Sequence, residues 1–468
     1  MEAHGEKQGL SERGRYFLLY IALTAAIVAF SVLYYFKYRD SAANAVPPPA
    51  HGVIEYEFPR APRPALNPGM TWELNLGGSG EDILGDVYYL NNGYYLFGTT
   101  DSYDYDFTTR AGGTANLFLA AADAGGKLNY TMIFGSGGAD KFVRARLYHD
   151  GFLVLADTDS DGGGYNLYYI KYSDYSVRHV ELGTPLTENA LELYTESDRI
   201  IIVARNYDRL IDKSSFIVTF LDRNMNMLSS SAVTRPGSME FLKIFPSAGG
   251  CTLVANVREG LASFVSFITV KPDTKPSYAD IKIGASFRAL DVAPARAGGF
   301  ALFTVPASAD GDAALILIAS DKTKKAEYPF PLKNAEHAVI MRTNDSFLAA
   351  ACGGGSDNSV QLDLDLAPIT ASPPALSGLG RVTAFITAPG GILILSQTPD
   401  GKKAELRALS DSLSLIYKQS FGGGTREIPI ALRSAGTGAI VFTNSYGAGG
   451  DVGLNFGKAD IWYFYAEI

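Results

Sequence analysis

WELNLGGSGEDILGDVYYLNNGYYLFGTTDS, residues 72–102, sets out the structural unit of this chain. A Gly-rich turn is followed by the apolar run DVYYL, the turn NNG and a second apolar run, YYLFG. Asn and Gly tolerate the positive φ values that tight hairpins require, and the aromatic and aliphatic residues on either side favour strands. The stretch therefore predicts two short antiparallel strands joined by a tight turn.

The second apolar run recurs along the 468-residue chain. Its copies, each placed after a turn that contains Gly, Asn, Asp or Ser, begin at residues 94, 152, 200, 252, 300, 347, 392 and 439, which are 45 to 58 residues apart. In the complete units, one strand-like run precedes each copy and two more follow. Four antiparallel strands repeated about every 50 residues are typical of propeller blades. The sequence therefore predicts an all-β fold, an eight-bladed β-propeller.

The eighth unit lacks its fourth strand. It stops at Ile468, whereas TWELNLGG at residues 71–78 precedes the first unit and matches YKQSFGGG at residues 417–424. We expect this N-terminal strand to complete the eighth blade, because closure removes an unpaired sheet edge. A solenoid, the competing repeat architecture, would need no such device.

A resemblance to a known family supports this interpretation. Residues 72–102 resemble bacterial propeller repeats of the pattern W…GGS..D…DGGY…G.T.S, with partial copies in the second unit (FGSGGAD, residues 134–140) and the eighth (FGGG, residues 421–424). The resemblance implies propeller architecture over residues 71–468. It implies little about function, because such propellers are largely binding scaffolds.

The N-terminal part predicts a membrane tether. Residues 16–36 carry no charge and, as a helix, would span ~31 Å, the thickness of a bilayer core. We therefore expect a cytoplasmic segment at residues 1–15, a single transmembrane helix at residues 16–36, a Pro- and Ala-rich linker at residues 37–70 and a propeller on the extracytoplasmic (periplasmic or extracellular) side. A cleavable signal peptide ending at Ala43-Asn44-Ala45 is the alternative.

Composition excludes several classes of protein. The net charge of −9 argues against nucleic-acid binding, which relies on clustered Lys and Arg. Cys251 and Cys352 are the only cysteines, so the chain has no disulfide framework, and their apolar surroundings predict buried thiols. The sequence leaves the oligomeric state open.

Loop length predicts a ligand-binding surface. The loops between the second and third strands are longest in units one and eight, which closure makes neighbours. Rigid tyrosines with acidic and small residues suit adaptable recognition of protein or glycan. The predicted ligand-binding residues are Tyr103, Asp104, Tyr105, Asp106, Phe107, Tyr446 and Asp451.

Two sets of carboxylates invite further interpretation. Asp157, Asp159 and Asp161 in DTDSDG could hold calcium as a cofactor, although solvated turn residues are the alternative. Asp82 and Asp140 occupy the same place in successive units. This repetition favours a structural bond to neighbouring backbone over catalysis.

No catalytic motif stands out, so binding is the leading hypothesis. The chain lacks a G-x-S-x-G elbow, an H-E-x-x-H motif and a phosphate-binding loop. We expect a membrane-tethered extracytoplasmic propeller that binds or scaffolds a protein or glycan. The alternative is a glycan hydrolase or lyase that uses carboxylates at the propeller face, and an envelope assembly factor is a third candidate by analogy.

Overall fold

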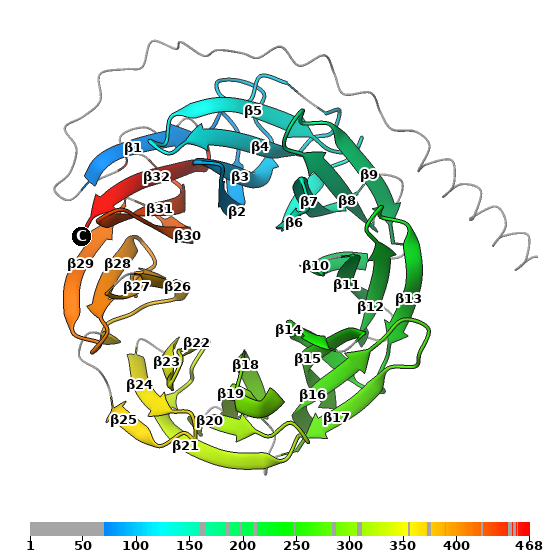
Figure 1. Cartoon of the computed structure of the whole chain (residues 1–468), viewed down its shortest axis with the longest axis vertical. Helices are drawn as coiled ribbons and strands as arrows, with labels where there is room; N and C mark the ends of the chain where they lie inside the picture. Colours follow the sequence, from blue (N-terminus) through cyan, green and yellow to red (C-terminus); the bar gives the residue numbers. More distant parts are fainter. Residues whose placement is uncertain are drawn as a thin grey trace, which may run out of the picture.

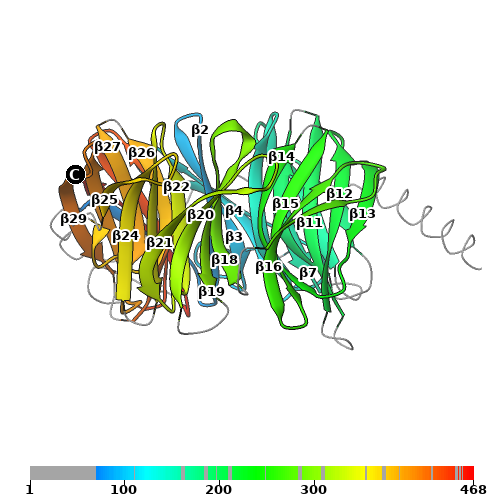
Figure 2. The same cartoon turned by 90° about the horizontal axis from the view of Figure 1, so that it is seen from below.

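The computed structural model describes residues 70–468 except 110, 160–163, 184–187, 197, 209–212, 248, 283–286, 307–310, 354–355, 372–375, 389, 423–424, 448–451, 453–454 and 456. Within this part of the chain, the strands form eight four-stranded antiparallel sheets. The sheets stand radially around a central opening, as Figure 1 shows, and form a short cylinder in the side view of Figure 2. The predicted eight-bladed β-propeller is confirmed.

Blades 1 to 4 follow one another along the chain. Blade 1 contains β2 (Asp82–Leu90), β3 (Gly93–Thr100), β4 (Asn116–Asp123) and β5 (Leu128–Phe134). Blade 2 contains β6 (Asp140–Tyr148), β7 (Gly151–Thr158), β8 (Gly164–Lys171) and β9 (Val177–Leu182). Blade 3 contains β10 (Glu188–Thr195), β11 (Arg199–Asp208), β12 (Lys213–Asp222) and β13 (Met227–Val233). Blade 4 contains β14 (Ser238–Ser247), β15 (Gly250–Glu259), β16 (Ala262–Val270) and β17 (Ser277–Ile281).

Blades 5 to 8 complete the ring. Blade 5 contains β18 (Phe287–Pro294), the 3-10 turn η2 (Arg296–Gly298), β19 (Phe300–Pro306), β20 (Asp312–Ile318) and β21 (Lys324–Lys333). Blade 6 contains β22 (His337–Arg342), β23 (Ser346–Gly353), β24 (Ser356–Asp363) and β25 (Pro368–Ala371). Blade 7 contains β26 (Val382–Ala388), β27 (Gly391–Gln397), β28 (Ala404–Ser410) and β29 (Leu415–Phe421). Blade 8 contains β30 (Glu427–Ala435), β31 (Gly438–Ser445), β32 (Asp460–Glu467) and β1 (Met70–Leu76).

The N-terminal strand closes the ring, as predicted. β1 pairs antiparallel with β32, with Leu74 opposite Tyr463 and Leu76 opposite Ile461, and so becomes the outermost strand of blade 8. The ring of Trp72 stacks on Tyr465 at a centroid distance of 6.4 Å. Blade 8 is therefore built from both ends of the propeller sequence.

The hydrophobic core lies between neighbouring blades. Side chains that alternate along each strand point to opposite faces of its sheet, so each blade packs on two neighbours. Phe97 of blade 1 meets Phe152 of blade 2 at 4.9 Å between ring centroids, and Phe421 of blade 7 meets Phe464 of blade 8 at 4.6 Å. Burying one such side chain contributes about 1.5–3 kcal/mol.

A bulge recurs in the innermost strands. The register shifts by one residue in seven of the eight described inner strands, all except β22. Charged residues that follow the bulge link adjacent blades: Arg144 lies 3.4 Å from Asp86 and 3.1 Å from Glu192, and Lys243 lies 3.0 Å from Asp291. These ion pairs link blades 1, 2 and 3 to one another, and blade 4 to blade 5.

The sequence predicts one membrane-spanning helix. Among the described residues, no helix is long and apolar enough to cross a membrane. The predicted transmembrane helix at residues 16–36 lies outside the described residues.

Cys251 is buried as expected, and burial raises the pKa of its thiol to about 12. Cys352 is only partly buried, because it lies near the exposed end of β23.

Candidate functional site

The two faces of the ring differ in their connections. One face, which we call the loop face, carries the loops between the second and third strands of each blade and the loops that join one blade to the next. The opposite face, the turn face, carries the connections between first and second strands and between third and fourth strands. Every predicted ligand-binding residue in the described part of the chain belongs to the loop face.

The turn GGSGE, residues 77–81, is held by acidic and hydroxyl side chains of blade 1. Its five consecutive backbone N–H groups each donate to a side-chain oxygen. Gly77 donates to Asp106 (3.0 Å), Gly78 to Asp82 (2.6 Å), Ser79 to Asp104 (2.7 Å), Gly80 to Ser102 (2.8 Å) and Glu81 to Asp101. The predicted ligand-binding carboxylates Asp104 and Asp106 therefore fix the turn that leads from β1 into blade 1.

The predicted aromatic surface is only partly exposed. Tyr103 and Tyr105 are 57% and 49% exposed, whereas Phe107 is fully buried against Phe118, with 5.1 Å between the ring centroids. Phe107 was expected on the surface, and this expectation is wrong. A turn closed by the hydrogen bond from its N–H to the Asp104 carbonyl directs the chain back into the blade 1 core.

The contribution of blade 8 to the predicted surface is small among the described residues. Tyr446 is partly buried, and the guanidinium of Arg426 lies 5.6 Å from the centre of its ring. Asp451 lies outside the described residues. Tyr103, Tyr105 and Tyr446 thus remain the aromatic candidates of this sector.

Asp82 is a buried structural carboxylate. It accepts hydrogen bonds from the Gly78 N–H at 2.6 Å, from the Ser102 hydroxyl at 2.9 Å and from the Thr100 hydroxyl. Burial raises its pKa to about 6, against the lowering effect of these donors. Asp140 holds the N–H and hydroxyl of Ser136 in the same way in blade 2, so the structural interpretation of this pair is supported.

The acid at the start of the inner strand is not present in every blade. Blades 8, 1, 2 and 3 begin their inner strands with buried Glu427, Asp82, Asp140 and Glu188. In blades 4 and 5, the residues at the corresponding place before the bulge are Met239 and Phe287. Four successive blades of the ring therefore begin with a buried acid, and blades 4 and 5 lack it.

Two carboxylates of the predicted calcium site have other partners. Asp157 accepts a hydrogen bond from the Ala190 N–H of blade 3 at 2.6 Å, and Asp159 accepts one from the Ala139 N–H. No group of three or more His, Cys, Asp or Glu suited to a metal occurs among the described residues. Asp161 lies outside them, and the calcium site stays a prediction.

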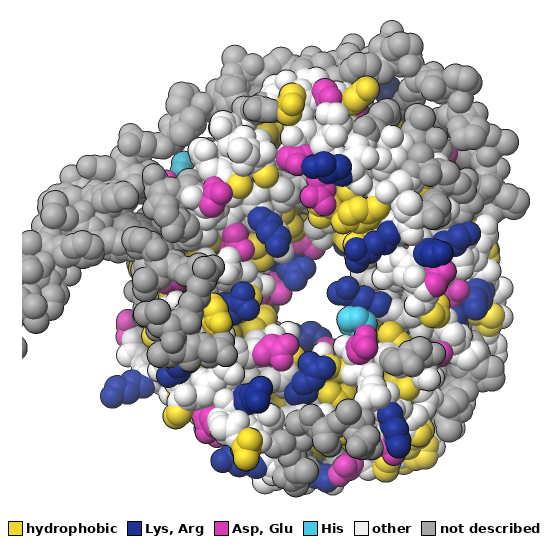
Figure 3. All heavy atoms as spheres, turned by 180° about the vertical axis from the view of Figure 1, so that it is seen from behind, with side chains coloured by type: hydrophobic (Ala, Val, Ile, Leu, Met, Phe, Trp, Pro, Cys, Tyr) yellow, Lys and Arg dark blue, Asp and Glu magenta, His cyan; other side chains and the backbone are white. Residues whose placement is uncertain are grey.

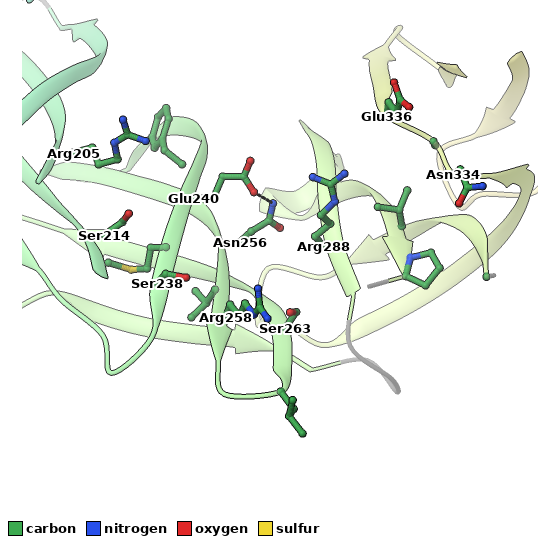
Figure 4. Close-up of a pocket in the computed structure, with 18 of the residues that line it drawn as sticks. Arg205, Ser214, Ser238, Glu240, Asn256, Arg258, Ser263, Arg288, Asn334 and Glu336 are labelled. Atoms are coloured by element: carbon green, nitrogen blue, oxygen red, sulfur yellow. Dashed lines mark hydrogen bonds between the residues drawn. The ribbon is translucent and has the colours of Figure 1, made fainter. Parts of the chain in front are cut away.

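A large cavity opens on the loop face at blades 3 to 6. Its volume is about 910 Å³, and strand ends of blades 4 and 5 form most of its wall. Figure 4 shows polar side chains converging on it from several strands. The labelled residues are Arg205, Ser214, Ser238, Glu240, Asn256, Arg258, Ser263, Arg288, Asn334 and Glu336.

Arginines dominate the charge of this cavity. Arg205 lies on β11, Arg258 on β15 and Arg288 on β18, so blades 3, 4 and 5 contribute one guanidinium each. Basic side chains also surround the central opening on the face drawn in Figure 3. The opposing carboxylates of the lining are Glu240 and Glu336.

Loop length in the sequence does not predict this cavity. It favoured the long loops of blades 1 and 8, but the cavity forms where the loops are short, as in REGLAS at residues 258–263. A short loop leaves the strand ends uncovered. The arginines near those strand ends, together with Met239 and Phe287 in place of the anchoring acid, were the available signals.

The chain thus forms a closed eight-bladed propeller with one large cavity on the loop face among its described residues. No protein-family model matches the chain, and no curated protein is significantly similar to it. Similar solved structures include the dihydro-heme d1 dehydrogenase NirN in complex with DHE (11% identity, 83% of this chain, 76% of that chain, TM-score 0.48). The Dos1 propeller is 11% identical over 84% of this chain and 94% of that chain, with a TM-score of 0.47. An acylaminoacyl peptidase of Pyrococcus horikoshii is 10% identical over 78% of this chain and 57% of that chain, with a TM-score of 0.43.

The chain thus spans 57% of the length of the peptidase. These likenesses include enzymes, and they neither support nor exclude a binding role. The architecture rests on the strand pairing of this chain.

Proposed function

We propose that this protein is a membrane-tethered binding module whose propeller lies on the extracytoplasmic side and holds a protein or glycan ligand at the loop face. The observation that carries the proposal is the cavity of about 910 Å³ at blades 3 to 6. Ligand pockets typically enclose about 300–1,000 Å³ and combine apolar walls with a few convergent polar groups. This cavity has both features.

The rigidity of its wall supports the proposal. Asn256 on β15 accepts a hydrogen bond from the Ala289 N–H at 2.7 Å and donates one to the Ala289 carbonyl at 2.9 Å. It also donates to Glu240 at 3.1 Å. Blades 4 and 5 are therefore fastened together beneath the cavity, and a preorganised surface loses less entropy on binding.

The carboxylates argue against the glycan hydrolase or lyase that the sequence left open. Burial raises the pKa values of Asp82, Asp86, Asp140 and Asp157, but these residues hold backbone groups within and between blades and do not line the cavity. The two carboxylates of the lining come from β14 and from the segment before β22, two blades apart. A binding site accounts for this arrangement more directly than a catalytic pair.

The proposal is tested by capture with matched variants of the full chain in detergent. Ser238→Trp places a large ring in the cavity, and Ser412→Trp places one on the exposed turn face as the control. We expect a ligand captured by the parent to be lost by Ser238→Trp and retained by Ser412→Trp, with similar melting temperatures. A variant with Tyr103, Tyr105 and Tyr446 changed to Ala tests the other sector.

If Ser238→Trp captures the ligand as well as the parent does, the cavity is not the binding site. Loss in the tyrosine variant alone would move recognition to the long loops of blades 1 and 8.

A further inference from the structure

We infer that the cavity binds an acidic peptide segment of a partner protein, with carboxylates at its arginines and an aliphatic side chain on its apolar floor. This inference rests on the proposed function and specifies the ligand of the same site. Three independent features of the cavity support it: its exposed arginines, its apolar floor and its exposed rim.

The arginines are available to a ligand. Arg258 and Arg288 are exposed, and neither forms an ion pair or hydrogen bond with another side chain that the structure describes. Arg205 is exposed too, although its charge also acts on the Asp157 carboxylate. Two arginines elsewhere in the ring are engaged: Arg144 bonds Glu192, and Arg235 bonds Glu259 and Asp280. A guanidinium presents a planar set of donors that matches a carboxylate, so exposed arginines from three successive blades favour an anionic ligand.

The charge balance points the same way. The cavity lining holds three arginines against Glu240 and Glu336, a net charge of +1, within a chain whose net charge is −9. Glu240 also accepts the hydrogen bond from Asn256, so the carboxylate is directed to the wall. A locally basic site in an acidic protein attracts an acidic segment while the rest of the surface repels it.

The floor favours a peptide over a sugar. Its apolar residues include Met239, Val257, Val305 and Leu332, which are buried at the base of the cavity. Phe241 is the one aromatic residue among the lining residues that the structure describes, and its ring already packs edge-on against Phe216 at 6.0 Å. Sugar rings stack on exposed aromatic planes, which this lining does not offer. An aliphatic side chain fits such a floor.

The rim adds a contact for a protein partner. Leu261 lies at the tip of the turn between β15 and β16 and is 97% exposed, the most exposed of the large apolar side chains in the described part of the chain. An apolar side chain beside a charged cavity is typical of a protein interface, where a buried apolar contact is surrounded by polar ones.

Fluorescence anisotropy with defined peptides tests the inference. The probes are labelled peptides that differ in how many glutamates flank one leucine, a matched lysine series, and an oligosaccharide of uronic acid. The full chain in detergent is compared with Arg258→Gln, Arg288→Gln and Leu261→Ser. Arg223→Gln, an exposed arginine in the turn between β12 and β13, is the control.

We expect affinity to increase with the number of glutamates and to fall with added salt. Each cavity arginine variant should weaken binding about tenfold or more, because it removes a charge-assisted hydrogen bond. Leu261→Ser should weaken binding several-fold, and Arg223→Gln should leave it unchanged. Replacing the leucine of the probe with serine should also weaken binding.

Other outcomes would overturn the inference in distinguishable ways. If the uronic acid oligosaccharide binds through the same arginines and the peptides do not, the ligand is a glycan and the proposed function stands. If the lysine series binds as well as the glutamate series, charge recognition is refuted. If no probe binds and Ser238→Trp also retains the captured ligand, both the inference and the cavity site fail.

Discussion

At the scale of single residues, the acids of the loop face act on the backbone. Asp82 and Asp106 each accept from an N–H group of the 77–81 turn, and Asp157 reaches the Ala190 N–H of the next blade. A buried N–H without a partner is costly, so short acidic side chains are an effective way to fix irregular turns. The acidic composition of these loops is thereby explained without a ligand.

Asp82→Asn should change how stability depends on pH. The pKa of Asp82 is raised from 3.8 to about 6 in the folded protein, so the folded state binds this proton more readily than the unfolded chain does. Its contribution to stability is therefore greatest below about pH 4 and declines as the pH rises through about 6. The full difference corresponds to roughly 3 kcal/mol.

Chemical denaturation at a series of pH values measures this effect. The parent should gain stability relative to Asp82→Asn as the pH falls from about 7 to about 4. A constant difference between the two proteins over this range would show that Asp82 titrates as an exposed acid does.

Phe107→Ala should destabilise the propeller by about 3–5 kcal/mol, because it leaves a cavity in the blade 1 core. Tyr103→Ala, four residues earlier on the exposed part of the loop, should change the unfolding free energy by less than about 0.5 kcal/mol. Equal effects of the two variants in denaturant unfolding would contradict the buried position of Phe107.

The residues of this loop show what sequence alone can and cannot resolve. Tyr103, Tyr105 and Phe107 look alike in the sequence, since all three are aromatic residues next to an Asp. The turn that buries Phe107 depends on the carboxylate contacts to residues 77–81, which lie in the preceding loop. Burial here is a tertiary property, and no local pattern predicts it.

At the scale of elements, the pattern of apolar runs and turns in the sequence predicted most of the fold. Turn residues and apolar runs predicted the four strands of each blade because side-chain alternation and hairpin chemistry are local. The partner of β1 followed from counting strands in the eighth unit. The inner-strand bulges and the cavity were not foreseen, because they depend on contacts between blades.

Deletion of residues 70–78 should prevent stable closure of the ring. The deletion removes β1, exposes the outer edge of β32 and leaves Tyr463 and Tyr465 without Trp72. An unpaired edge strand promotes aggregation. We expect a lower melting temperature and soluble aggregates by size-exclusion chromatography.

A matched control replaces residues 71–78 with the similar segment of blade 7, residues 417–424. It should restore part of the stability, because an outer strand is present again. A deletion variant that melts and elutes like the parent would contradict closure by β1.

At the scale of the whole molecule, the ring divides into two regions. Blades 8, 1, 2 and 3 begin with a buried acid, while the cavity centres on blades 4 and 5, which begin with Met239 and Phe287. The repeat signature is clearest in blades 8, 1 and 2, which belong to the first of these regions. Blades 4 and 5, whose sequences depart from this signature, form most of the wall of the cavity.

The tether proposal makes a prediction about the mature chain. Intact mass spectrometry of protein from the native membrane fraction should give a mass that includes residues 16–36, because an uncleaved helix anchors the propeller. A mature chain that begins at Val46, directly after Ala43-Asn44-Ala45, would contradict the tether and support a secreted propeller.

Hydrogen–deuterium exchange of the full chain, with and without its captured ligand, tests the central claim most directly, because it locates binding on the ring. The claim predicts slower exchange in peptides that cover residues 238–241, 256–263 and 334–336, which border the cavity. The loop at residues 101–107 and the turn face should exchange at unchanged rates. Protection confined to residues 101–107 and Tyr446, with none around the cavity, would contradict the account.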